Sequence, residues 1–278
     1  MTAGATITQD ELSSLIAPRE RAYLGLVVIA SLLIYGLLFL VLRNAVGGDK
    51  GAAGGAVLLI YVPIIAAVYF LSHLYAMGRL RGNGIRVTAS QLPVVNRLVI
   101  AHSQALGLKE APAAYVVQAG GLLNAFATKF FIRQFVVLYS DVVALAMEEG
   151  EGALGFVVAH ELAHIRRGHL RFRWLTLPGR LVPYLGSAYS RACEYTCDRF
   201  AAKCEPKHAV SGLLVLAAGR SLYRLIDATS FAAQVDTEAG FWVRRAELAS
   251  SHPLLPKRVA ALLDAGIPRP TLVDAPHS

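Results

Sequence analysis

Two long apolar segments without any Asp, Glu, Lys or Arg constrain this chain more than any other feature. The first runs from Ala22 to Leu42 and the second from Gly51 to Gly78. About 20 apolar residues cross the hydrocarbon core of a bilayer as a helix, whose backbone bonds are all satisfied internally. We therefore expect two transmembrane helices, the second of them kinked at Pro63.

Composition agrees with residence in a membrane, because 55% of the 278 residues are hydrophobic and only 17% are charged. The link 43–55 is short and rich in Gly, which predicts a tight helix hairpin over residues 22–80 after an N-terminal segment of residues 1–21. A cleaved signal peptide is the alternative for the first segment. The acidic residues Asp10, Glu11 and Glu20 before it are atypical of a signal peptide and favour an anchor.

Basic residues are denser at the outer ends of this hairpin than in its connecting loop: Arg19, Arg21, Arg79, Arg81 and Arg86, against Arg43 and Lys50. The positive-inside rule therefore places both termini in the cytoplasm, together with everything after Gly78. The formal net charge of +8 is scattered along the chain and lacks the aromatic-basic pattern of an RNA-binding module, so we expect no nucleic-acid partner. The three cysteines, Cys193, Cys197 and Cys204, are predicted to be reduced thiols.

The sequence His160-Glu161-Leu162-Ala163-His164 is the strongest chemical signal in the chain. Residues four apart on a helix lie on one face, so both imidazoles can bind the same Zn²⁺ ion. Glu161 lies one residue further round the helix, where it can act as a general base on water without being a ligand. The spacing thus indicates a zinc hydrolase, which needs a third protein ligand.

Two patterns compete for the third ligand. The metzincin pattern would place Gly at position 167 and His at position 170, where this chain has Arg167 and Leu170. His169 falls off the zinc-facing side, and we expect it to be a surface or helix-terminal histidine. Glu194 and Asp198 instead share one helix face, so that Glu194 can bind the metal while Asp198 supports a zinc-bound histidine.

The remaining patterns predict one domain over residues 87–266, followed by a flexible tail over residues 267–278. Helices are expected over residues 92–106, 151–169, 191–202, 209–226 and 256–265, and short strands over 114–118, 124–127 and 135–139. The apolar segment 174–189 is interrupted by prolines and is too short to span, so it should dip into the membrane surface or pack on the core. Residues 227–249 show no clear pattern.

Four sequence blocks in this order resemble the membrane zinc endopeptidases of the HtpX group, which also includes the type I CAAX prenyl proteases. The blocks are Asn124-Ala125-Phe126-Ala127, Ala159–His169, Arg191–Arg199, and Ser251-His252-Pro253 followed by Lys257-Arg258. The resemblance covers roughly residues 90–265 and the two preceding spans. It implies an α+β fold: a two-helix transmembrane hairpin, then a mainly helical gluzincin-type zinc protease domain with a small β-sheet.

The resemblance also implies roles for several residues. Asn124, Ala125 and Phe126 would lie in the edge strand that lines the substrate, and His252 would stabilise the oxyanion beside the metal. Arg258 would orient the site or bind substrate carbonyls. Position 197 is Cys where the family has a small residue, and about 30 residues between His164 and Glu194 leave no room for another spanning pair. The resemblance therefore does not extend to prenylated substrates.

Taken together, the sequence predicts an integral, multi-pass membrane zinc endopeptidase with the ligands His160, His164 and Glu194. We expect it in the bacterial inner (plasma) membrane, with the catalytic domain on the cytoplasmic side. Its partners would be protein or peptide substrates and the lipid bilayer, and its role quality control or processing of membrane or misfolded proteins. Two alternatives stay open: a catalytically degenerate membrane scaffold or regulator, and a CAAX-type processing protease.

Overall fold

The two apolar segments form the longest helices of the molecule. A computed structural model describes residues 6–47, 52–118, 125–130, 133–149, 151–169, 173 and 175–270. Helix α2 spans Pro18–Gly47 and α3 spans Ala52–Asn83, with Pro63 inside it. Both helices are long and apolar enough to cross a membrane. Little of either is buried inside the molecule: in the most apolar part of each helix, 11% of the residues of α2 and 6% of those of α3 are buried. Their exposed apolar side chains are what a lipid environment would cover.

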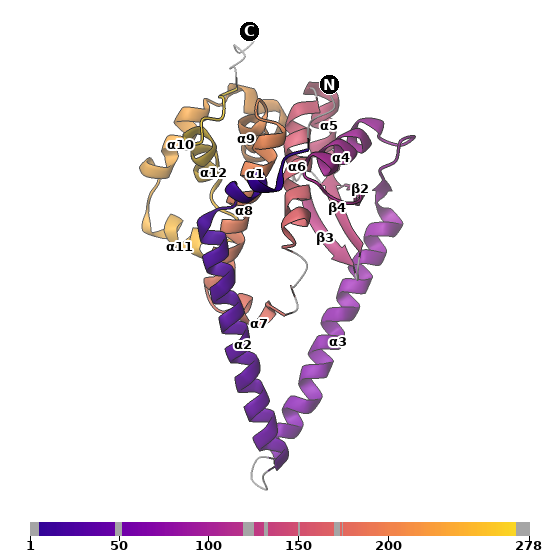
Figure 1. The fold of residues 1–278 in the computed structure, drawn as a ribbon, viewed down its shortest axis with the longest axis vertical. Coiled ribbons are helices and arrows are strands. Elements are labelled where there is room, and N and C mark those ends of the chain that lie inside the picture. The colour runs from indigo at the N-terminus through magenta and orange to yellow at the C-terminus, as the bar shows by residue number, and fades with distance from the viewer. Residues whose placement is uncertain are drawn as a thin grey trace.

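The two helices form a V rather than the tight hairpin expected from the short link. They converge at the end where residues 47 and 52 lie and separate toward the rest of the molecule (Figure 1). The tight-hairpin expectation is therefore wrong, for a physical reason. Helix α2 packs along α7 (Leu177–Leu181) and α8 (Leu185–Cys204), whereas α3 leads into strand β1 (Ile85–Arg86) at the sheet edge.

A small sheet of four strands lies on one side of the domain. Its order is β1, β2 (Ala113–Val117), β4 (Arg133–Tyr139), β3 (Ala125–Phe130). Strands β2 and β4 are parallel, and the other two pairs are antiparallel. Strand β4 is central, and its run from Phe135 to Leu138 is buried, as a continuous apolar run of this length predicts. Strand β3 forms the outer edge of the described sheet, next to helix α6.

Helices make up the rest of the domain, around α6 (Glu151–Arg167), which is buried from Ala153 to Ala163. Helices α4 (Pro93–Ala105), α8 and α9 (Ala209–Leu222) and strand β3 pack around it. The remaining helices of the described residues are α1 (Gln9–Ser14), α5 (Ser140–Glu149), η1 (Tyr223–Leu225), α10 (Ala228–Thr237), α11 (Phe241–Ala249) and α12 (Leu255–Asp264). The predicted helices are present, but α8 begins at Leu185, and residues 227–249, which show no clear sequence pattern, form α10 and α11.

The short helix α7 shows what the interrupted apolar segment 174–189 does. It packs against α2 rather than into the domain core: the Gly179 N–H donates to Ser31 Oγ at 2.9 Å. A Cβ atom at Gly179 would collide with the backbone carbonyl oxygen of Val27, so only glycine permits this approach. Trp174 and residues 170–172 lie outside the described residues, as do residues 271–278 of the predicted tail.

We predict that Gly179→Ala destabilises the protein, because the added methyl group forces α7 away from α2. Overpacking of this kind costs about 1–3 kcal/mol, which lowers the thermal midpoint by several degrees. Thermal unfolding of the purified protein in detergent measures the effect. Gly25→Ala is the matched control, because a Cβ atom at Gly25 in α2 meets no atom within 4 Å. Equal midpoints for the two variants would contradict the tight α2–α7 contact.

Candidate metal centre

Three side chains from two helices converge on one point. His160 and His164 lie one turn apart on α6, and Glu194 reaches them from α8. The two Nε2 atoms are 3.3 Å apart, and each lies 3.3 Å from an oxygen of Glu194. Two ligands 2.0–2.1 Å from a tetrahedral zinc are separated by about 3.3 Å, so this set fits the ion. The sequence-predicted ligands are therefore brought together with the spacing that such a site needs.

Two buried charged residues, Asp198 and Arg258, contact this group. Asp198, one turn after Glu194, places Oδ1 3.0 Å from His160 Nδ1. Arg258 from α12 donates to both oxygens of Asp198, at 2.6 and 2.8 Å, and its Nη1 lies 3.4 Å from Glu194 Oε2. Arg258 is 5% exposed, so the geometry favours the orienting role over the alternative of binding substrate carbonyls.

The electrostatics of the group favour a cation. Burial lowers the pKa of His160, but its hydrogen bonds to Asp198 and Glu194 outweigh burial and raise the pKa to about 10. Burial raises the pKa of Glu194, yet the hydrogen bonds from His160 and His164 hold it well below its usual value. The two buried carboxylates, Asp198 and Glu194, thus face the Arg258 guanidinium and the His160 ring, and a metal ion in place of the His160 proton would balance their charge in the same way.

A cavity of about 290 Å³ opens beside these residues. Glu161 lines it and is 7% exposed, next to the three converging side chains. His252 also lines it, with Nε2 3.6 Å from Glu194 Oε1 and Nδ1 3.0 Å from Ser251 Oγ. The His252 side chain is 64% exposed, so it can reach a ligand in the cavity. The predicted general base and the predicted oxyanion residue thus border the same space.

The expected substrate-lining strand can be followed only in part. Asn124 lies outside the described residues, while Ala125 and Phe126 begin β3. In the described sheet β3 is paired on one side only, with β4, and it lies next to α6, which carries both histidines. The backbone placement is therefore that of an edge strand beside the metal centre.

His169 lies just past the end of α6, as one of the two expected positions has it, but it is buried rather than at the surface. Gly168 adopts a left-handed conformation, with φ at 70°, and ends α6. The chain reverses at this glycine, and the backbone N–H of His169 donates to the carbonyl oxygen of His164 at 3.2 Å. His169 is 8% exposed, and burial lowers its pKa to about 4, so the ring is neutral at neutral pH.

Sequence reasoning missed Glu20 as a residue near the site. It lies in the first turn of α2, is 1% exposed, and places Oε1 3.3 Å from His169 Nε2. The same oxygen accepts from Arg167 Nη2 at 2.6 Å. No local pattern distinguishes an acidic residue that faces inward before an apolar helix from one that faces water. Only the packing of α2 on α8 and the contact of Glu20 with Arg167 at the end of α6 reveal it.

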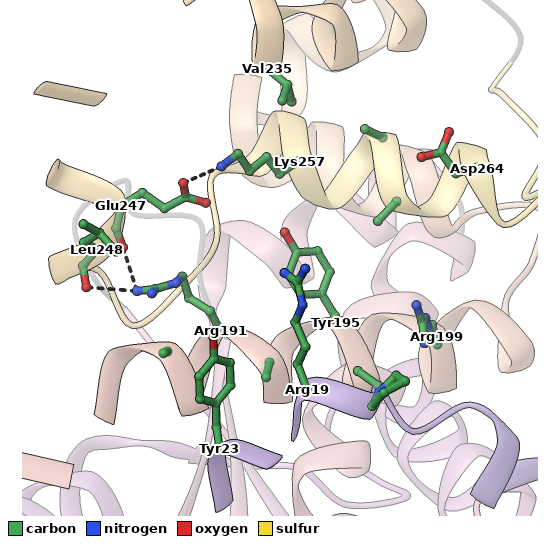
Figure 2. A pocket seen from close by; sticks show the side chains of 16 residues that line it. Arg19, Tyr23, Arg191, Tyr195, Arg199, Val235, Glu247, Leu248, Lys257 and Asp264 are labelled. Atoms are coloured by element: carbon green, nitrogen blue, oxygen red, sulfur yellow. Dashed lines mark hydrogen bonds and ion pairs between the residues drawn. The ribbon is translucent and has the colours of Figure 1, made fainter. Parts of the chain in front are cut away.

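A second, larger cavity lies away from this centre. Its volume is about 660 Å³, and Arg19, Tyr23, Arg191, Tyr195 and Arg199 are among the residues that line it (Figure 2). None of the three converging ligands borders it, nor does Glu161 or His252. Several of its cations are already engaged: Arg191 donates to backbone carbonyls of residues 247, 248 and 250, and Lys257 pairs with Glu247. The residues that could bind a metal and act on a substrate therefore line the smaller cavity.

Comparison with known proteins agrees with the geometry. Searches among curated proteins and among solved structures give no match. The family model of peptidase family M48 matches residues 90–182 and 180–265, which is more than half of the chain. This is the family of the HtpX and type I CAAX zinc metallopeptidases, and the matched ranges contain all three converging ligands, Glu161 and His252. The chain belongs to peptidase family M48.

Proposed function

We propose that this chain is a membrane-anchored zinc endopeptidase that hydrolyses peptide bonds of membrane or misfolded proteins. One observation carries the proposal: the ligand atoms of His160, His164 and Glu194 lie 3.3 Å apart beside a cavity that Glu161 also lines. Membership of a metallopeptidase family supports the reaction class. The proposed role is quality control or processing at the membrane.

The metal-binding set would be of the gluzincin type, with two histidines from α6 and Glu194 from α8. Bound Zn²⁺ would supply Lewis-acid polarisation of the scissile carbonyl and would lower the pKa of water. Asp198 accepts from His160 Nδ1 and so directs Nε2 of that ring toward the metal position. Arg258 holds Asp198 in place through two hydrogen bonds.

Glu161 and His252 would carry the proton and the developing charge. Glu161 takes the proton from the attacking water and delivers it to the nitrogen of the leaving amine. His252, which lines the same cavity, donates to the oxygen that becomes negative as the carbonyl is attacked. Substrate would pair with β3 as an added strand through residues 124–127, so recognition rests on its backbone more than on its sequence.

The anchor would confine cutting to the vicinity of the bilayer. We propose a transmembrane hairpin over residues 22–80, a metallopeptidase domain over 87–266, an N-terminal segment over 1–21 and a tail over 267–278. The basic residues at the outer ends of the hairpin favour a cytoplasmic active site in a bacterial inner membrane. A degenerate scaffold has no chemical need for Glu161, and no described feature favours a prenylated substrate.

Replacement of Glu161 by Gln tests the reaction itself. We predict that Glu161→Gln lowers cleavage of an unfolded substrate such as casein at least about 100-fold, because the general base is lost. The metal ligands are untouched, so zinc content measured by atomic absorption should stay at one ion per chain. The degenerate-scaffold reading would gain if wild type and variant both bound zinc and neither cleaved casein or a membrane protein. Wild type that binds no zinc would contradict the metal assignment.

His252→Ala separates an oxyanion role from a packing role. We predict that kcat falls about 100- to 1,000-fold, the loss typical of removing one oxyanion donor, while KM and zinc content change little. Steady-state cleavage of a fluorogenic peptide measures both constants. Ser251→Ala is the matched control, since it removes only the 3.0 Å contact to His252 Nδ1 and should cost far less. Unchanged kcat in His252→Ala would assign the residue to packing.

Topology can be read with a membrane-impermeant maleimide. The natural cysteines are poor reporters, because Cys193 and Cys197 are buried and Cys204 is half-buried. We predict that Ser14→Cys and Arg269→Cys, both at exposed positions, react in inverted vesicles but not in intact spheroplasts. Lys50→Cys in the connecting loop should show the opposite pattern. Labelling of Arg269→Cys from outside would place the domain in the periplasm.

A further inference from the structure

The metal-side histidines are supported unequally by the residues named so far. Nε2 of each ring faces Glu194, so Nδ1 is the atom left for a supporting partner. His160 Nδ1 has Asp198 at 3.0 Å. His164 Nδ1 has no carboxylate but lies 2.9 Å from His169 Nδ1. Ligand histidines almost always donate their second N–H to a carboxylate, carbonyl or water, so this contact needs an explanation.

We propose that Glu20 and His169 form a relay that positions His164, which makes Glu20 on α2 a positioning residue of the metal centre. The inference rests on the proposed zinc site and extends it to the membrane helix. His169 Nε2 lies 3.3 Å from Glu20 Oε1, so the chain of contacts runs from the carboxylate through one ring to the next. His160 thus contacts a carboxylate, that of Asp198, directly, whereas His164 is linked to a carboxylate, that of Glu20, through an intervening imidazole.

One proton arrangement is consistent with a metal at Nε2 of His164. That nitrogen then directs its lone pair at the metal position, so Nδ1 carries the hydrogen and donates to His169 Nδ1. A ring nitrogen that accepts a hydrogen bond has no hydrogen of its own, so the hydrogen of His169 lies on Nε2, which faces the Glu20 carboxylate and donates to it. The contacts therefore match the tautomer of His164 that can bind a metal.

Burial gives these contacts their weight. Glu20 is 1% exposed and His169 8%, so both side chains are largely removed from bulk water. The start of α2 is held against α8 by a further buried contact, in which the Ala17 N–H donates to Thr196 Oγ1 at 3.0 Å. The position of Glu20 is thus defined by helix packing. A hydrogen bond in such surroundings orients its partner more strongly than one at the surface.

The same residues invite a rival reading as a second metal site. Glu20, His169 and Cys193 place one ligand atom each within 4.8 Å of one another. One observation disfavours it: Arg167 already supplies a positive charge to Glu20 at 2.6 Å. Zinc stoichiometry distinguishes the two readings.

Zinc affinity of the full-length protein tests the relay. Competition with a chelator is measured in the Glu161→Gln background, so the readout does not depend on cleavage. We expect His169→Leu, which keeps bulk but loses both hydrogen bonds, to weaken zinc binding about 10- to 100-fold. His169→Gln keeps one acceptor and one donor and should retain affinity within about threefold. Equal losses in both variants would assign His169 to packing and overturn the proposal.

A second pair of variants separates the relay from the ion pair of Glu20 with Arg167. Glu20→Leu should weaken zinc binding like His169→Leu, and the double variant should be no weaker than either, because both act through one chain of bonds. Arg167→Leu removes the ion pair but leaves the relay, so its zinc affinity should match the parent. An equal loss in Arg167→Leu, additive losses in the double variant, or two zinc ions per parent chain would overturn the proposal.

The design also distinguishes failure of the relay from failure of the proposed function. A parent protein that binds no zinc contradicts the metal centre itself. A parent that binds one zinc, with His169→Leu and Glu20→Leu binding it equally well, contradicts only the relay. Should Glu20→Leu fail to fold, judged by thermal unfolding, the comparison of His169→Leu with His169→Gln decides the question alone.

Discussion

The buried contact of Arg258 with Asp198 and Glu194 is the interaction on which the site depends. It joins α12 to α8, and through Asp198 it reaches His160 on α6. Two carboxylates at 5% and 2% exposure are costly to bury unless a positive charge faces them. The arginine supplies one positive charge, and the rings of His160 and His164 face Glu194 from α6. Protein stability and the proposed metal binding therefore depend on one set of buried charges.

The apolar helix α2 and the peptidase-family domain are not independent parts joined by a flexible link. Helix α2 contacts α8 through Ala17 and Thr196, α7 through Ser31 and Gly179, and α6 through Glu20. These contacts run from the first turn of α2 well into its apolar stretch. They explain why α2 diverges from α3, and they place a carboxylate of the apolar helix two hydrogen bonds away from a proposed metal ligand.

Much of the fold and most of the site follow from local patterns. The apolar spans, the α6 helix with its pair of histidines and the α8 helix with Glu194 and Asp198 each depend on spacings within a few turns. The burial of His169 does not follow from such a pattern, because it depends on Gly168 reversing the chain at the end of α6 and on Glu20 of α2 packing against the ring. Helix α11 contributes nothing to the core, because none of its residues is buried.

The sequence by itself determined the reaction class, since two histidines four apart with a glutamate between them can share one metal on any helix that contains them. It also determined that two helices are apolar enough to span a bilayer. Only the tertiary structure decided which groups support those histidines. Arg258 and Glu20 come from opposite ends of the chain, and each lies beside the site because α12 and α2 pack on α8. Buried charges depend on partners brought by packing between helices, and the spacing of residues along one helix does not specify that packing.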